Sequence, residues 1–148
     1  MRISVKGRYA LAAVIEIARN RGNRENVTAV NISGTLGISK IYLEQVLAQL
    51  KKADVLLAAK GSRGGYQLSR PPSNITAWEV LCALESALVE PTENTVEDNS
   101  PEIEAAMMEL VFLPLDAAVR AFLSKTTIQD LLDCSEKQKA EQAFMLNM

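Results

Sequence analysis

Apolar residues recur at helical spacing through the first fifty residues and predict three helices. The first begins after Ser4, which suits a helix N-cap, and keeps its pattern as far as Asn20. The second runs from a Thr28 cap to Gly37, and its inward positions are expected to be Val30, Ile32 and Leu36. The third begins after Ser39 and carries a buried stripe at i, i+3, i+4, i+7 spacing: Leu43, Val46, Leu47 and Leu50. This order, with a tight glycine-containing turn before the longest helix, is that of a helix-turn-helix.

The next segment predicts a small wing and a fourth helix. The runs 55–59 and 66–69 suit short strands and flank a glycine-rich tip, and two prolines at 71 and 72 end the hairpin. Thr76 and Glu79 have the spacing of a capping box, and apolar residues follow at helical intervals through Leu88. The fold class is therefore mainly α with a small β-wing, a winged helix-turn-helix.

The second half of the chain predicts a linker followed by a long helix. Residues 90–101 are acidic and contain two prolines, which indicates an exposed, flexible linker. A long apolar stripe then requires a partner helix: Ile103, Met107, Leu110, Val111, Leu115, Ala118, Val119, Phe122 and Leu123. Pro114 should kink or restart this helix, and a short capped helix is expected over 127–132. The predicted domains are 1–89 for DNA binding, 90–101 as linker and 102–148 for dimerisation.

Charge separates the same two parts. The net charge of the 148 residues is only −2. Residues 1–72 carry 12 basic and 4 acidic side chains, whereas residues 73–148 carry 4 basic and 14 acidic ones. A head of charge +8 on a tail of charge −10 is typical of a protein that meets DNA with one end.

Composition argues against several other classes. No stretch approaches the roughly 18 to 20 apolar residues of a membrane span, and the N-terminus has no signal-peptide core, so a cytoplasmic protein without membrane contact is expected. There is no histidine to act as a base, and the glycine loop leads into a strand and not into a helix N-terminus. Cys82 and Cys134 stand alone in sequence. We therefore expect neither an enzyme nor a metal or cofactor.

Three separated motifs carry a family resemblance. Residues 2–10 read RISVKGRYA, residues 42–45 read YLEQ, and Gly61 is followed by Gly64-Gly65-Tyr66. In this order and spacing they resemble the Rrf-two (Rrf2) family of bacterial winged-helix transcription regulators. The resemblance implies a homodimer that crosses its long C-terminal helices on double-stranded DNA, each protomer placing a recognition helix in a major groove and a wing along a minor groove. The dimer contacts are then expected from Met107, Leu110, Val111, Leu115, Ala118, Val119 and Phe122.

The same resemblance and the chemistry of the side chains indicate DNA contacts. Gln45 and Glu44 can exchange hydrogen bonds with base edges, although a carboxylate also repels phosphates and can act by excluding wrong sequences. Glycines let the wing backbone approach the duplex, and Lys60 or Arg63 can enter the narrow groove, while Tyr9, Tyr42 and Tyr66 can equally be packing residues. The full expected set is Arg2, Lys6, Arg8, Tyr9, Ser39, Lys40, Tyr42, Glu44, Gln45, Lys60, Ser62, Arg63, Gly64 and Gly65.

Two departures from the family pattern bear on control. Iron-sulfur members carry three closely spaced cysteines after the fourth helix, but residues 86–106 contain none. The chain therefore resembles the cluster-free branch. Lys60 stands where relatives often have arginine, which removes a bidentate contact.

The leading hypothesis is a repressor that reads a pseudo-palindromic operator. The alternative is a regulator that binds a metabolic enzyme through its acidic, Met-containing C-terminal half.

Overall fold

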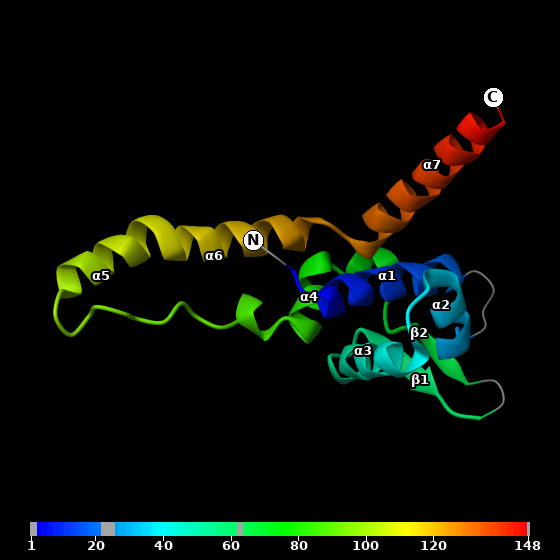
Figure 1. Cartoon of the computed structure of the whole chain (residues 1–148), viewed down its shortest axis with the longest axis horizontal. Coiled ribbons are helices and arrows are strands. Elements are labelled where there is room, and N and C mark those ends of the chain that lie inside the picture. The colour runs from blue at the N-terminus through cyan, green and yellow to red at the C-terminus, as the bar shows by residue number, and fades with distance from the viewer. Residues whose placement is uncertain (1–2, 22–25, 62–63, 148) are drawn as a thin grey trace.

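The computed structural model describes residues 3–21, 26–61 and 64–147. Three expected DNA contacts, Arg2, Ser62 and Arg63, lie outside the described residues. The described part forms a helical head with a two-stranded wing, from which one long helix extends to one side and the last helix to the other (Figure 1). None of the described helices is long and apolar enough to cross a membrane.

The three helices at the start of the head are confirmed: α1 (Val5–Arg19), α2 (Ala29–Leu36) and α3 (Lys40–Lys52). The hydroxyls of Ser4, Thr28 and Ser39 each accept a hydrogen bond from a first-turn amide, and Gly37 ends α2 in the left-handed conformation at φ 68°. One inward position is wrong. Val30 is 59% exposed, because it is about 200° around α2 from Ile32, which is fully buried.

The wing is a single antiparallel pair, β1 (Leu56–Ala59) and β2 (Gly65–Leu68), each one residue from its expected start. Leu56 pairs with Leu68 at the base, and Ala59 pairs with Gly65 near the tip. The wing is also tied to the segment before α2. The Val27 amide donates to the Tyr66 carbonyl at 2.9 Å, and the Tyr66 amide donates to the Val27 carbonyl at 2.8 Å. These bonds hold β2 against the helix-turn-helix.

After the wing and a 3-10 turn, η2 (Pro72–Asn74), the fourth helix α4 (Ala77–Leu84) closes the head. Thr76 caps it by accepting from the Glu79 amide at 3.2 Å. The reciprocal half of the expected capping box is missing, because the Glu79 carboxylate pairs with Arg70. The expected continuation to Leu88 is also wrong, since that residue lies in a separate 3-10 turn, η3 (Ser86–Leu88).

The expected long helix is continuous through α5 (Pro101–Met107), the π-helical segment η4 (Met108–Phe112) and α6 (Leu113–Lys125) (Figure 1). Pro114 lacks the amide hydrogen that would bond to the carbonyl of Leu110 in an α-helix. The wider π turn immediately before it accommodates this missing bond. Pro114 lies in the first turn of α6, the position expected where a helix restarts, and the backbone stays in the right-handed helical region at both ends of η4.

The last helix, α7 (Ile128–Leu146), is much longer than the expected 127–132. Its far part is exposed and lacks the apolar stripe that marks a packed helix, although its Glu, Lys, Gln and Ala residues favour helix formation. Its start packs into the head: Ile128 is fully buried, and its amide donates to the Ile75 carbonyl at 2.8 Å. Arg19 of α1 donates to Glu136 at 3.0 Å and to Ser135 at 2.9 Å. The domain boundary at residue 102 stays a prediction, but α7 begins inside the core of the head.

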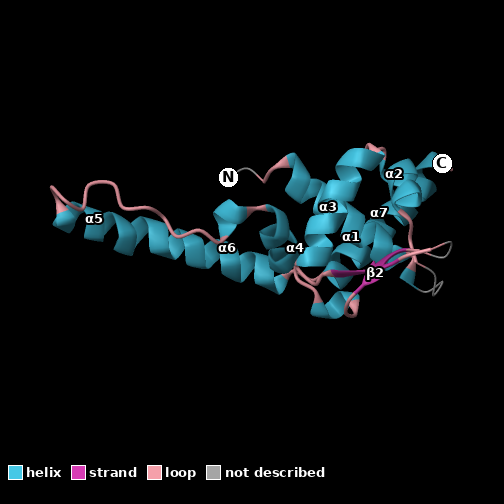
Figure 2. Cartoon of the chain, turned by 90° about the horizontal axis from the view of Figure 1, so that it is seen from below, coloured by secondary structure: helices cyan, strands magenta, loops and turns pink. Residues whose placement is uncertain are grey.

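Residues 90–100 form an exposed connection without helix or strand that leads from the head to the start of α5, alongside the long helix (Figures 1 and 2). Glu104 of α5 holds this connection. Its carboxylate is buried and accepts hydrogen bonds from the Val96 amide at 2.9 Å and from the Thr95 amide and hydroxyl, both at 3.2 Å. The expected flexibility of the segment stays a prediction, but these bonds anchor its middle, at Thr95 and Val96.

Candidate nucleic-acid interface

One side of α3 holds the head together and the other is open. Its four stripe residues, from Leu43 to Leu50, are fully buried. At about 100° per residue, the side opposite this stripe is centred on four exposed residues that fall within about 60° of one another: Ile41, Gln45, Ala48 and Lys52. Gln45 is therefore among the side chains that point most directly away from the protein. Glu44 is exposed on the flank, where its carboxylate lies 3.8 Å from Lys40, an exposed ion pair of little energetic weight.

An aromatic cluster lies beside the N-terminus of α3. The rings of Tyr9 and Tyr42 meet edge to face with centroids 5.5 Å apart, and the Lys6 ammonium lies 5.9 Å from the Tyr42 ring centroid. A hollow of about 460 Å³ opens here, lined by Val5, Tyr9, Ile38, Ser39 and Tyr42. The positive end of the α3 dipole and the nearby lysine favour an anion at this place. Both tyrosines are half-buried, so they contribute to packing and can still expose an edge.

The wing glycines are constrained by the chain itself. A β-carbon on Gly64 would come within 2.6 Å of the Ala59 carbonyl oxygen, and one on Gly65 within 2.8 Å of the Val27 carbonyl oxygen. Gly65 also has φ 138°, a backbone conformation that residues other than glycine rarely adopt. These contacts explain both glycines through the fold of the hairpin tip. Lys60 is exposed at the end of β1, where it can meet a phosphate.

The remaining basic candidate on the described head, Arg8, is exposed on the first turns of α1. Lys6 is half-buried in the same turns. The structure thus gathers Lys6, Tyr9, Ser39 and Tyr42 around the start of α3, while Lys60 belongs to the separate wing. DNA contact by each of these residues stays a prediction.

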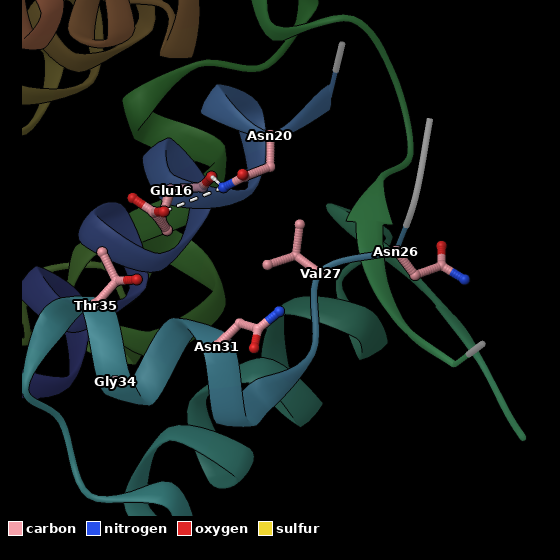
Figure 3. Close-up of a pocket in the computed structure, with 7 residues that line it drawn as sticks. All are labelled: Glu16, Asn20, Asn26, Val27, Asn31, Gly34 and Thr35. Carbon is pink, nitrogen blue, oxygen red and sulfur yellow. Dashed lines mark hydrogen bonds between the residues drawn. The ribbon is translucent and has the colours of Figure 1, made fainter. Parts of the chain in front are cut away.

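A second hollow, of about 510 Å³, lies between α1 and α2 and is lined mainly by polar residues (Figure 3). Val27 and Asn31 extend from the α2 side toward Asn20 at the end of α1 (Figure 3). The buried carboxylate of Glu16 is engaged within α1: it accepts from Asn20 at 3.1 Å and from Arg19 at 3.0 Å. This carboxylate therefore holds the end of α1 in place.

The expected dimer residues lie on the long helix, and most remain uncovered in a single chain. Leu110 is 76% exposed, Phe122 is 70% exposed, and Val111 and Leu115 are about half exposed. Ala118 is exposed, and Met107 and Val119 are partly buried. On α6, Leu115, Ala118 and Phe122 share one side at i, i+3, i+7 spacing. The Arg120 guanidinium lies 5.8 Å from the Trp78 ring centroid, a contact that links α6 to α4 of the head.

The side chains do not fit an iron-sulfur cluster of the kind held by cysteines. The two cysteines lie on different helices, Cys82 half-buried on α4 and Cys134 exposed on α7. Burial raises the pKa of the Cys82 thiol, and Arg120 opposes this only in part, so the thiolate that binds iron is disfavoured. In residues 3–21, 26–61 and 64–147, no three His, Cys, Asp or Glu side chains come together to hold a metal ion.

Ile41 and Ala48 are absent from the expected DNA contacts, which on α3 are all polar or charged residues. The sequence did contain the signal that places them. The periodicity that buries Leu43 and Leu47 also directs Ile41 and Ala48 outward beside Gln45. The burial of Ile128, by contrast, depends on a contact with α1 and Ile75 that no local pattern reveals.

The four head helices, the capped outward helix α3 and the β1–β2 hairpin define a winged helix-turn-helix protein. The family model of Rrf2, described as iron-dependent transcriptional regulators, matches residues 3–134. The chain therefore belongs to the Rrf2 family of transcriptional regulators.

Named relatives agree with this assignment. The chain is 34% identical to the HTH-type transcriptional regulator CymR of Bacillus subtilis over 147 residues, which are 99% of this chain and 100% of that protein. It is 31% identical to the regulator IscR of Cereibacter sphaeroides over 140 residues, covering 89% of this chain and 87% of that one.

Solved structures give the same result. The structure of B. subtilis CymR, described as the global cysteine regulator of that organism, matches with a TM-score of 0.74 and 33% identity over 90% of this chain and 97% of that one. T. potens IscR matches with a TM-score of 0.69 and 26% identity, covering 93% and 90% of the two chains.

Proposed function

We propose that this protein is a repressor that binds a pseudo-palindromic DNA operator as a homodimer, without an iron-sulfur cluster and without enzymatic activity. The observation that carries the proposal is α3, whose Gln45 side faces away from the core while its capped N-terminus adjoins Lys6 and two tyrosines. In this proposal α3 enters the major groove, the cluster at its N-terminus receives a phosphate, and Lys60 on the wing meets the backbone nearby.

Selection from random duplexes followed by anisotropy titration tests the DNA-binding step. A defined motif should emerge, with an affinity that falls as salt rises by a slope of about −0.9 per phosphate contact. Equal affinity for the selected and scrambled duplexes contradicts sequence-specific binding. In a purified transcription assay, the protein should lower transcript yield from a promoter that carries the motif and leave a scrambled promoter unchanged; a rise in yield would indicate an activator.

The dimer is supported by the apolar side of α5–α6, where Leu110 and Phe122 are largely exposed in one chain. Cluster-free control is supported by the cysteine-free segment 86–106 and the disfavoured Cys82 thiolate. Anaerobic reconstitution with iron and sulfide should give no visible charge-transfer absorption above that of a variant in which both cysteines are serine. Near-stoichiometric iron and sulfide with such absorption would overturn this part of the proposal.

A second candidate function is binding of a metabolic enzyme through the C-terminal half. The observation in its favour is the apolar end of α7, where Phe144, Met145 and Leu146 are 70 to 86% exposed. Removing residues 144–148 should abolish co-purification of such a partner from tagged protein while operator affinity stays unchanged. Unchanged partner recovery would reject this candidate.

A further inference from the structure

Ile41 is an apolar residue at an unusual place. It is the second residue of α3 and is 75% exposed, although a large aliphatic side chain gains free energy when it leaves water. Its neighbours on the same side of the helix are Gln45, one turn further along, and the smaller Ala48. The fold therefore uses Ile41 neither in the core of the head nor in the cap of α3.

We infer that Ile41 contacts the C5-methyl group of a thymine in the major groove, and so helps to choose the operator sequence. The inference rests on the proposed function, in which α3 enters that groove. Residues near the N-terminus of a recognition helix approach the base edges most closely. The thymine methyl is the apolar group that base pairs present there, and isoleucine has no polar atom with which to read any other feature.

The helix also limits where this thymine lies. Ile41 and Gln45 are four positions apart in the sequence, which corresponds to about 6 Å along the helix axis. Base pairs follow one another at about 3.4 Å along the duplex. The thymine is therefore expected within about two base pairs of the base that Gln45 reads, once in each half-site.

Deoxyuridine provides the test, because it pairs like thymine and lacks only the methyl group. Each thymine of the selected operator is replaced by deoxyuridine in turn, in both half-sites, and the dissociation constant is measured by anisotropy. The wild-type protein should lose about four-fold in affinity per half-site at one position near the Gln45 contact, the effect of about one buried methyl group. If no thymine shows this effect while specific binding is intact, the inference is wrong.

Variants assign the effect to Ile41. Ile41→Ala should bind the thymine and deoxyuridine duplexes equally, whereas Ile41→Val keeps a branched apolar side chain and should retain part of the discrimination. The matched control is Val30→Ala, which also shortens an exposed aliphatic residue, 59% exposed, but on α2. It should leave the discrimination unchanged. If Ile41→Ala still discriminates as the wild type does, another residue holds the methyl group, and the inference is overturned.

The proposed function and the contact between Ile41 and thymine are rejected by different results. A wild-type protein that does not distinguish selected from scrambled DNA rejects the proposed function and the inference with it. A protein that binds its operator specifically but ignores the thymine methyl rejects the inference alone. Because Ile41 is largely exposed, thermal melts of its variants should match the wild type, which separates a lost contact from a lost fold.

Discussion

At the scale of single residues, Gln45 and Arg8 are expected to contribute to DNA binding in different ways. Gln45 is one of the four exposed residues on the outward side of α3, so Gln45→Ala should reduce discrimination at one base pair of each half-site by about 1–3 kcal/mol. Arg8 is exposed on α1 and is expected to meet a phosphate. Arg8→Ala should weaken all duplexes similarly and make the salt slope shallower by about 0.9 per lost contact.

Anisotropy titrations on the operator, single-base variants and a scrambled duplex separate the two effects. Lys125→Ala is the matched control for Arg8→Ala, since it also removes one exposed positive charge but at the end of α6. If Arg8→Ala and Lys125→Ala lose the same affinity for DNA, the effect comes from the net charge of the protein and not from a contact by Arg8. Unchanged base preference in Gln45→Ala would remove Gln45 from the set of base-reading residues.

At the scale of elements, Glu104 should make the anchoring of the linker depend on pH. The Val96 amide is the largest cause that lowers the pKa of this carboxyl, and Thr95 acts in the same direction, while burial opposes them. Because the folded pKa is below the unfolded value of about 4.3, the charged form stabilises the fold above that value. This stability is lost as the pH falls through the folded pKa.

Thermal melts from pH 7 downward test this element. Glu104→Gln should lower the melting temperature at pH 7, and the difference from the wild type should shrink as the pH falls below 4. Glu102→Gln is the matched control, because it removes the same charge from an exposed position in the first turn of α5. A gap between wild type and Glu104→Gln that stays constant over the whole range would show that the hydrogen bonds to the charged carboxylate do not matter.

The attachment of α7 to the head gives a second prediction at this scale. Ile128 is fully buried among core residues, so Ile128→Ala should lower the free energy of unfolding by about 2–5 kcal/mol. Leu146→Ala, at a position 86% exposed on the same helix, should change it by less than about 0.5 kcal/mol. Urea denaturation measures both. A small effect of Ile128→Ala would mean that α7 does not contribute to the stability of the head.

At the scale of the whole molecule, what the sequence predicted depended on how local each cause was. Thr28 and Gly37 mark the two ends of α2 through contacts within a few residues. The positions of α1, α3 and the wing are likewise predicted by capping residues, glycines and apolar periodicity. The apolar character of Val30 predicts an inward position, but its angle on the short helix α2 turns it outward, where it is 59% exposed. The burial of Glu104 and Ile128 depends on segments nine and more than fifty residues away, which no local pattern encodes. For the DNA interface, side-chain polarity predicts a contact by Gln45 but does not predict one by Ile41.

The uncovered side of the long helix yields the prediction that involves the whole assembly. Leu115 and Phe122 are 50% and 70% exposed on one side of α6, so replacing both with glutamate should prevent two copies from packing there. The variant should be a monomer by analytical ultracentrifugation at concentrations where the wild type is a dimer. Its affinity for the full operator should fall by about 10²-fold or more, because the two heads no longer bind as a linked pair.

Two controls separate dimerisation from charge and folding. Phe144→Glu with Leu146→Glu adds the same charge at exposed apolar positions of α7, and it should remain a dimer with nearly wild-type operator affinity. On a duplex with a single half-site, where only one head can bind specifically, the α6 variant and the α7 variant should bind alike, since α1–α3 and the wing are unchanged in both. A wild-type protein that is a monomer would contradict the dimer. An α6 variant that still sediments as a dimer would place the contact between protomers elsewhere. An α6 variant that is monomeric yet keeps full operator affinity would show that the two half-sites are bound independently.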